Sequence, residues 1–123
     1  MTAAGEARAR AASALALWRE VVTGLVRADD RDLTQRQFAL LLHVYTQPPP
    51  HTVRALAAAL AIPKPAVSRG LDVLARAGLV KRMRDTADRR DVHAARTVAG
   101  AVYLRDLADR IVATAEGHGA IIP

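Results

Sequence analysis

The side chains best suited to chemistry lie together in the stretch 64–72. Lys64, Ser68 and Asp72 follow one another at intervals of four residues, and Arg69 lies beside Ser68. On a helix these positions share one face, which offers an ammonium, a hydroxyl and a guanidinium to base edges and phosphates. The opposite face is apolar and is expected in the core: it carries Val67, Leu71 and Leu74. A helix over 64–77 with these two faces suits the major groove of DNA.

No other group of residues has the spacing of a catalytic or metal site. The four histidines lack the spacing of a zinc-binding helix; they are His43, His51, His93 and His118. The sequence has no glycine-rich phosphate loop and no nucleophile elbow. We therefore predict no catalytic residue, no metal, no cofactor and no enzymatic activity. A histidine–carboxylate metal site assembled in three dimensions is the alternative.

Two short helices joined by a tight turn would position the polar face. Thr52 is a good N-cap for the first helix, on which Leu56 and Leu60 share one side. Residues 61–63 break this pattern, and the prolines at 63 and 65 suit the first turn of the second helix. Gly78 is expected to end that helix in a left-handed conformation. The stretch 52–78 therefore predicts a helix-turn-helix.

A β-hairpin is predicted directly after the two helices. In the strand over 79–84, Val80 and Arg82 lie on one face, with Lys81 and Met83 on the other. The charged, turn-rich segment 85–90 precedes a second strand over 92–96. A strand, a basic tip and a second strand after a helix-turn-helix make a winged helix, whose tip can reach the DNA backbone or a neighbouring groove.

Residues 52–100 resemble the winged-helix core of MarR-type transcriptional regulators. The matching residues are Leu56-Ala57, the run 66–69 (Ala-Val-Ser-Arg), Leu71, Leu74, the run 77–80, the wing triplet Asp88-Arg89-Arg90 and the run 97–100. Residues 33–42 resemble the second helix of the same family. The resemblance implies a dimeric DNA-binding regulator, often released by small ligands. Arg96 differs from the apolar residue that the family prefers before Thr97, and we expect it to extend outward or to contact a phosphate.

Helices are also predicted on both sides of this core. The segment 6–28 carries an apolar stripe, Thr34 and Gln37 form a capping box for the next helix, and Thr97 can cap a last helix to 116. Residues 1–5 are expected to be disordered. The expected dimerisation residues are Leu15, Trp18, Val22, Leu25, Leu104, Leu107 and Ile111. The family usually continues with further dimer-forming helix, whereas 98–123 allow one helix and a tail, a shortened C-terminal dimerisation region that leaves the dimer geometry open.

Net charge is concentrated on the predicted winged helix. Residues 51–96 hold ten basic and four acidic side chains, so they carry the whole net charge of +6. This is the pattern expected of a surface that binds a polyanion. The chain has no cysteine and no apolar run long enough to span a membrane. These features favour a cytoplasmic, nucleoid-associated protein.

We predict one mainly α-helical domain over 1–123 with a small β-hairpin: flanking helices over 6–28 and 97–116 surround a winged helix-turn-helix core over 34–96. Its function is that of a sequence-specific regulator that binds double-stranded DNA as a homodimer on a pseudo-palindromic operator. The expected DNA contacts are Thr52, Lys64, Pro65, Ala66, Ser68, Arg69, Arg84, Arg89 and Arg90.

Two questions stay open at this stage. A small aromatic effector could bind among Trp18, Phe38, Tyr45 and Tyr103, although the same residues also suit an ordinary core. The alternative function is a protein-interaction module or antirepressor that forms a heterodimer with a full-length regulator.

Overall fold

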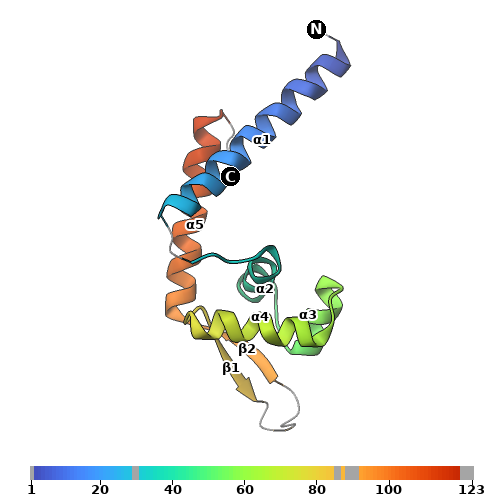
Figure 1. Cartoon of the computed structure of the whole chain (residues 1–123), viewed down its shortest axis with the longest axis vertical. Helices are drawn as coiled ribbons and strands as arrows, with labels where there is room; N and C mark the ends of the chain where they lie inside the picture. Colours follow the sequence, from blue (N-terminus) through green and yellow to red (C-terminus); the bar gives the residue numbers. More distant parts are fainter. Residues whose placement is uncertain (1, 29–30, 85–86, 88–91, 120–123) are drawn as a thin grey trace. The chain divides into compact units, whose positions relative to one another are not determined.

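The computed structural model describes residues 2–28, 31–84, 87 and 92–119. Within these residues the chain forms helices and one two-stranded antiparallel sheet (Figure 1). It divides into two compact units, one of residues 33–104 and one of residues 1–32 with 105–123. The predicted class, mainly α with a small hairpin in a winged helix-turn-helix, is confirmed. The single-domain organisation stays a prediction.

Three helices of the first unit begin where the sequence places their caps. Helix α2 spans Gln35–Thr46, and Thr34 and Gln37 form the predicted capping box. Helix α3 spans Val53–Leu60, and the Thr52 hydroxyl accepts a hydrogen bond from the Ala55 backbone N–H at 3.0 Å. Helix α4 spans Lys64–Arg76 after Pro63. The side chains of the threonines that precede α2 and α3 therefore accept hydrogen bonds from backbone N–H groups that have no partner within the helix.

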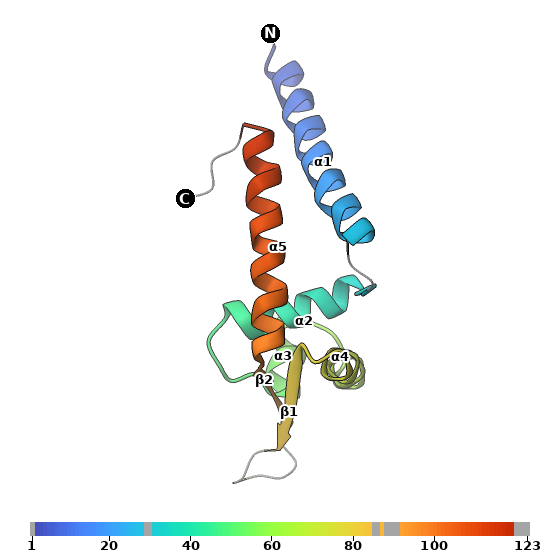
Figure 2. The same ribbon diagram turned by 90° about the vertical axis from the view of Figure 1, so that its left-hand side faces the viewer.

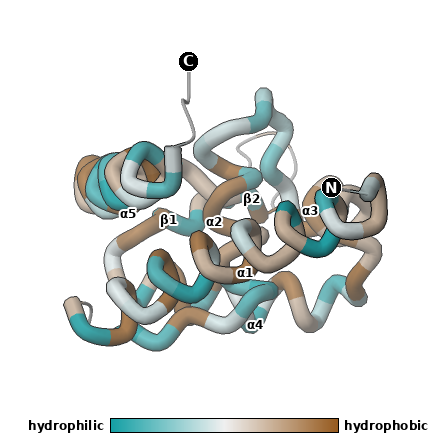
Figure 3. The backbone as a smooth tube through the Cα atoms, turned by 90° about the horizontal axis from the view of Figure 1, so that it is seen from above, coloured by the Kyte–Doolittle hydropathy of each residue, from teal (hydrophilic) through white to brown (hydrophobic). Residues whose placement is uncertain are grey.

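The two turns around α4 use left-handed backbone. Ala61, with φ 54°, ends α3, and Gly78, with φ 78°, follows α4 as predicted. Gly78 adopts this conformation without the steric penalty of a Cβ. The tube in Figure 3 shows polar and apolar residues alternating along α4, as expected for a helix with one buried face.

The hairpin consists of β1, Val80–Arg84, and β2, Val92–Arg96. Its register pairs Val80 with Arg96 and Arg82 with Ala94. Val80 and Ala94 are buried, whereas Lys81 and Met83 are exposed on the other face. A bridge between Thr52 and His93 joins the start of α3 to β2. The hairpin is thereby fixed at its base to the helix-turn-helix.

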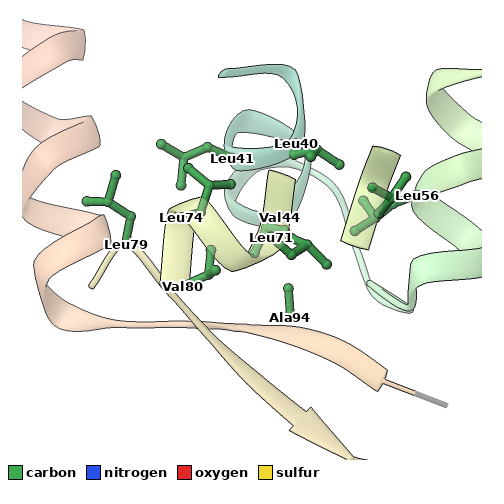
Figure 4. Close-up of a cluster of buried hydrophobic side chains, with 10 residues drawn as sticks. Leu40, Leu41, Val44, Leu56, Leu71, Leu74, Leu79, Val80 and Ala94 are labelled. Atoms are coloured by element: carbon green, nitrogen blue, oxygen red, sulfur yellow. The ribbon is translucent and has the colours of Figure 1, made fainter. Parts of the chain in front are cut away.

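A single apolar cluster holds this unit together (Figure 4). The three core residues predicted for α4 are fully buried. The rest of the cluster comes from α2, α3, the two strands and the residue directly before β1. The cluster contains Leu40, Leu41, Val44, Leu56, Val67, Leu71, Leu74, Leu79, Val80 and Ala94. Gly70 lets α4 approach α2 closely, since an added Cβ there would meet the Leu40 side chain. The core thus fixes the orientation of α4.

A polar junction attaches the last helix, α5 (Val98–Gly117), to this core. The Tyr45 hydroxyl donates to the Leu79 carbonyl at 2.7 Å and accepts from the Thr97 N–H at 2.8 Å. The Thr97 hydroxyl donates to the Gly78 carbonyl and caps α5 by accepting from the Gly100 N–H. Gly100 is buried, and an added Cβ would meet Tyr45 and the Leu79 carbonyl.

The second unit contains α1, Ala3–Ala28, and the later turns of α5, which run side by side (Figures 1 and 2). Gly24 faces the Arg110 side chain, and His118 pairs with Glu20 at 2.9 Å. The expectation of disorder over 1–5 is wrong for residues 3–5, which are helical. The Thr2 hydroxyl accepts from the Gly5 N–H and so starts the helix earlier. No helix among the described residues has the length and apolar character needed to cross a membrane.

Candidate nucleic-acid interface

The outer face of α4 is the candidate recognition surface. Val67, Leu71 and Leu74 are buried on the inner side, so the helix turns Lys64 and Arg69 outward, and both are exposed. Lys64 is the first residue of α4, where the positive end of the helix dipole favours anions. Arg69 lies more than a turn further on. An exposed guanidinium there can bond to a guanine edge through two donors or to a phosphate.

The smaller residues of the predicted contact set lie around the start of α4. Pro65 is exposed and Ala66 is half-buried. Thr52 is half-buried, and its hydroxyl oxygen accepts the capping hydrogen bond of α3. Its hydroxyl proton is not needed for that bond, so Thr52 could still donate to a phosphate.

Ser68 is bonded to the wing. Arg82 of β1 donates from one terminal nitrogen to the Ser68 carbonyl at 3.3 Å and from the other to the Ser68 hydroxyl oxygen at 3.3 Å. It also pairs with the Asp72 carboxylate. We call these three residues, Arg82, Asp72 and Ser68, the Arg82 network. The network was not predicted, although the alternation of β1 already placed Arg82 on the same face as Val80.

Arg96 also binds within the protein. Its Nε donates to the Val44 carbonyl at 2.8 Å, and its guanidinium carbon lies 5.8 Å from the centre of the Tyr45 ring. A terminal nitrogen donates to the Gln47 carbonyl at 3.4 Å. Arg96 is exposed, as expected, and it caps carbonyls at the end of α2, which have no partner within that helix. A phosphate contact by Arg96 stays a prediction.

The wing contributes further basic residues. Arg84 is exposed at the end of β1, and Lys81 is exposed on the outer face of the same strand. Arg89, Arg90 and the predicted tip residue Asp88 lie outside the described residues. The described part of the wing therefore supplies two exposed cations.

No group of three or more histidine, cysteine or carboxylate side chains within the described ranges could hold a metal ion. Two of the described histidines have polar partners of another kind. His51 is buried, with its Nε2 3.0 Å from the Gln47 carbonyl, and His118 pairs with Glu20. Apart from the Asp72 carboxylate, which pairs with Arg82, the side chains described above on α4 and the wing offer donors and cations, the groups that bind phosphates and base acceptors.

A winged helix-turn-helix with a basic outer face is the class of protein that these features define. The sequence model of the MarR family matches residues 31–91, which span α2, α3, α4 and β1. The chain belongs to this family and has the fold of its transcriptional regulators. No curated protein matches the chain.

Solved structures share the fold over nearly the whole chain. A mutant of MepR from Staphylococcus aureus has a TM-score of 0.73 and 22% identity, and covers 95% of this chain and 81% of its own. CouR from Rhodococcus jostii, bound to p-coumaroyl-CoA, has a TM-score of 0.62 and 25% identity. The match covers 98% of this chain and 81% of CouR. Overoxidized AbfR, bound to DNA, has a TM-score of 0.63 and 21% identity. The match covers 89% of this chain and 79% of AbfR.

Proposed function

We propose that the protein is a sequence-specific transcriptional regulator that binds double-stranded DNA through α4 and the wing. The observation that carries this proposal is the position of the charge: the whole net charge of +6 lies within residues 51–96. Lys64, Arg69 and Lys81 of this segment are exposed on α4 and β1. The DNA-bound state of AbfR, which has the same fold, supports the proposal.

The contacts divide by chemistry. Arg69 reads a base edge in the major groove, because its planar guanidinium can form two parallel hydrogen bonds to guanine. Lys64 binds a phosphate, where its point charge adds to the dipole of α4. Pro65 and Ala66 line the groove wall, and Arg84, Arg89 and Arg90 bind backbone or minor groove. Thr52 and Ser68 complete the contact set.

Salt-dependent binding to a labelled random-sequence duplex tests this function. Affinity should fall steeply between about 50 and 200 mM salt, since each phosphate contact adds about 0.9 to the slope of log affinity against log salt concentration. Replacing Lys64 and Arg69 with alanine should weaken binding. The matched control replaces Arg8 and Arg10, which are exposed on α1, and so removes the same charge from another helix. Equal losses in the two double variants would contradict an interface on α4.

The proposed regulator is a homodimer that places two recognition helices on a pseudo-palindromic operator. Support comes from the uncovered apolar stripe of α1, where Leu15 is 72% and Trp18 60% exposed. Val22 is exposed, and Leu25 and Ile111 are half-buried, whereas Leu104 and Leu107 already pack within their own chain. A heterodimer with a full-length regulator is the alternative partner for the same stripe.

An aromatic effector forms the last part of the proposal. The support is the p-coumaroyl-CoA bound to CouR, a protein with the same fold. Tyr45 and Tyr103 pack against the apolar cluster, which favours a core role for these two rings. A thermal shift with p-coumaroyl-CoA, compared with coenzyme A alone, tests for recognition of an aromatic acyl group.

A further inference from the structure

We propose that Arg82 is a positioning residue of the DNA-reading surface, which holds Ser68 as a hydrogen-bond donor toward DNA and joins β1 to the middle of α4. This inference rests on the proposed function, because it assigns a role within DNA recognition to a residue that does not itself touch DNA. It differs from the simpler expectation that an arginine of a basic wing binds a phosphate.

The geometry of the guanidinium supports a positioning role. Arg82 is half-buried, and its two terminal nitrogens both donate to α4. One reaches the Ser68 carbonyl and the Asp72 carboxylate, and the other reaches the Ser68 hydroxyl. A planar guanidinium with several fixed donors can hold such positions at once, whereas a lysine ammonium acts as a single point charge.

The neighbours of Arg82 on β2 and α4 explain why its side chain turns toward the helix. Its register partner on β2 is Ala94, a small residue that is buried on the same face of the hairpin. The small side chain leaves room for Arg82 to cross from β1 to α4. The negative charge of Asp72 then compensates the guanidinium, so this arginine contributes less to the attraction of phosphates than the exposed Lys81 on the same strand.

The hydrogen bond to Ser68 sets the direction of the serine hydroxyl. A guanidinium can only donate, so the Ser68 oxygen must be the acceptor. The hydroxyl proton is then available for a second partner, which has to be an acceptor. In the major groove the acceptors are guanine O6 and N7, adenine N7 and thymine O4, whereas the cytosine amino group is a donor. Ser68 held in this way should favour an acceptor at one position of the site.

The test measures base preference as well as affinity. Wild-type protein first selects a site from a randomised duplex pool. That site and a random duplex are then titrated with four single variants and with the double variant that combines Asp72→Asn and Arg82→Ala. Asp72→Asn and Arg82→Ala break the Arg82 network from its two ends. Arg82→Lys keeps the charge but not the planar fork. Lys81→Ala is the matched control, because it removes a charge from the same strand outside the network.

We expect Asp72→Asn and Arg82→Ala each to weaken binding to the selected site about tenfold, the effect of one ordinary hydrogen bond. The double variant should lose no more than either single variant, since both break one network. Repeating the selection should show a relaxed preference at one base position. Arg82→Lys should not restore that preference, and Lys81→Ala should keep it while weakening both duplexes alike.

A direct phosphate contact predicts the opposite pattern. Arg82→Ala would then lower the salt slope by about 0.9, Asp72→Asn would tighten binding to both duplexes, and Arg82→Lys would restore affinity. This pattern overturns the inference but leaves the proposed function intact. Wild-type protein that binds no duplex would defeat the proposed function itself. Circular dichroism checks folding, and if Arg82→Ala does not fold, the sign of the Asp72→Asn effect decides between the two roles.

Discussion

The arginines of the winged helix have two different roles, although the sequence shows one basic segment. Arg82 and Arg96 donate to groups of their own chain, on α4 and at the end of α2. Lys64 and Arg69 extend from α4 into solvent. The net charge of the segment therefore overstates the number of its side chains that face DNA, and the exposed residues are the ones to test for direct contact.

Arg69 and Lys64 should differ in how they affect sequence discrimination. Arg69→Ala should weaken binding to the selected site by about 1–3 kcal/mol and weaken binding to random DNA less, because a base contact is lost. Lys64→Ala should weaken both by similar factors, because a phosphate is present in every sequence. Paired titrations of the two duplexes at two salt concentrations measure this difference. Equal losses for Arg69→Ala would identify it as another phosphate contact.

At the scale of elements, the polar junction of Tyr45, Thr97 and Gly100 sets where α5 leaves the winged helix. The Tyr45 hydroxyl bridges the residues before β1 and α5. Gly100 gives that hydroxyl its space. A tyrosine predicted as a candidate effector contact thus has a structural role, because its polar end satisfies backbone groups that burial would otherwise leave unpaired.

Gly100→Ala should destabilise the fold. The new methyl group would overlap the Tyr45 hydroxyl and the Leu79 carbonyl, and one of the two must move. We expect a loss of about 3 kcal/mol in the free energy of unfolding, measured by chemical denaturation. Gly117→Ala is the control in the same helix, since a methyl group there meets nothing within 4 Å. That variant should be neutral or slightly more stable, and equal losses at both positions would argue against the junction.

The wing should act through phosphates. Arg89 and Arg90 belong to the basic tip predicted from sequence, so replacing both with alanine should weaken binding to every duplex. The slope of log affinity against log salt should fall by about two, from about 0.9 for each contact. Binding measured over a range of salt gives this slope directly. An unchanged slope in a folded variant would exclude a backbone role for the tip.

At the scale of the whole molecule, the apolar stripe of α1 is the main surface without a partner in the described chain. Its members Leu15, Trp18 and Val26 are 72%, 60% and 75% exposed. They recur at helical spacing, so they form one side of α1. Such a side on a long helix is typical of an association surface.

The protein should sediment as a dimer at micromolar concentration without DNA. Leu15→Glu with Trp18→Glu should shift it to a monomer, because a charge in an apolar interface must be desolvated. Ser13→Glu is the control, since Ser13 is exposed and lies on the opposite side of the same helix. A wild-type monomer would favour the heterodimer alternative, and dissociation by Ser13→Glu alone would show that the interface is elsewhere.

The sequence by itself determined the elements and their faces. Capping side chains, apolar spacing, and the glycine and prolines around α4 act within a few residues, so the starts of α2, α3 and α4, the buried face of α4 and the left-handed Gly78 were predictable. The start of α1 was missed because the cap at Thr2 lies so close to the chain end.

Only the tertiary structure decided where the long polar side chains point. Arg82 finds its partners 14 residues away in sequence at Ser68, and Arg96 finds the Val44 carbonyl 52 residues away. An arginine can extend into solvent or fold back over its own chain at similar free energy. The choice therefore depends on which acceptors the packed core brings within reach, and local spacing carries no record of those distant carbonyls and carboxylates.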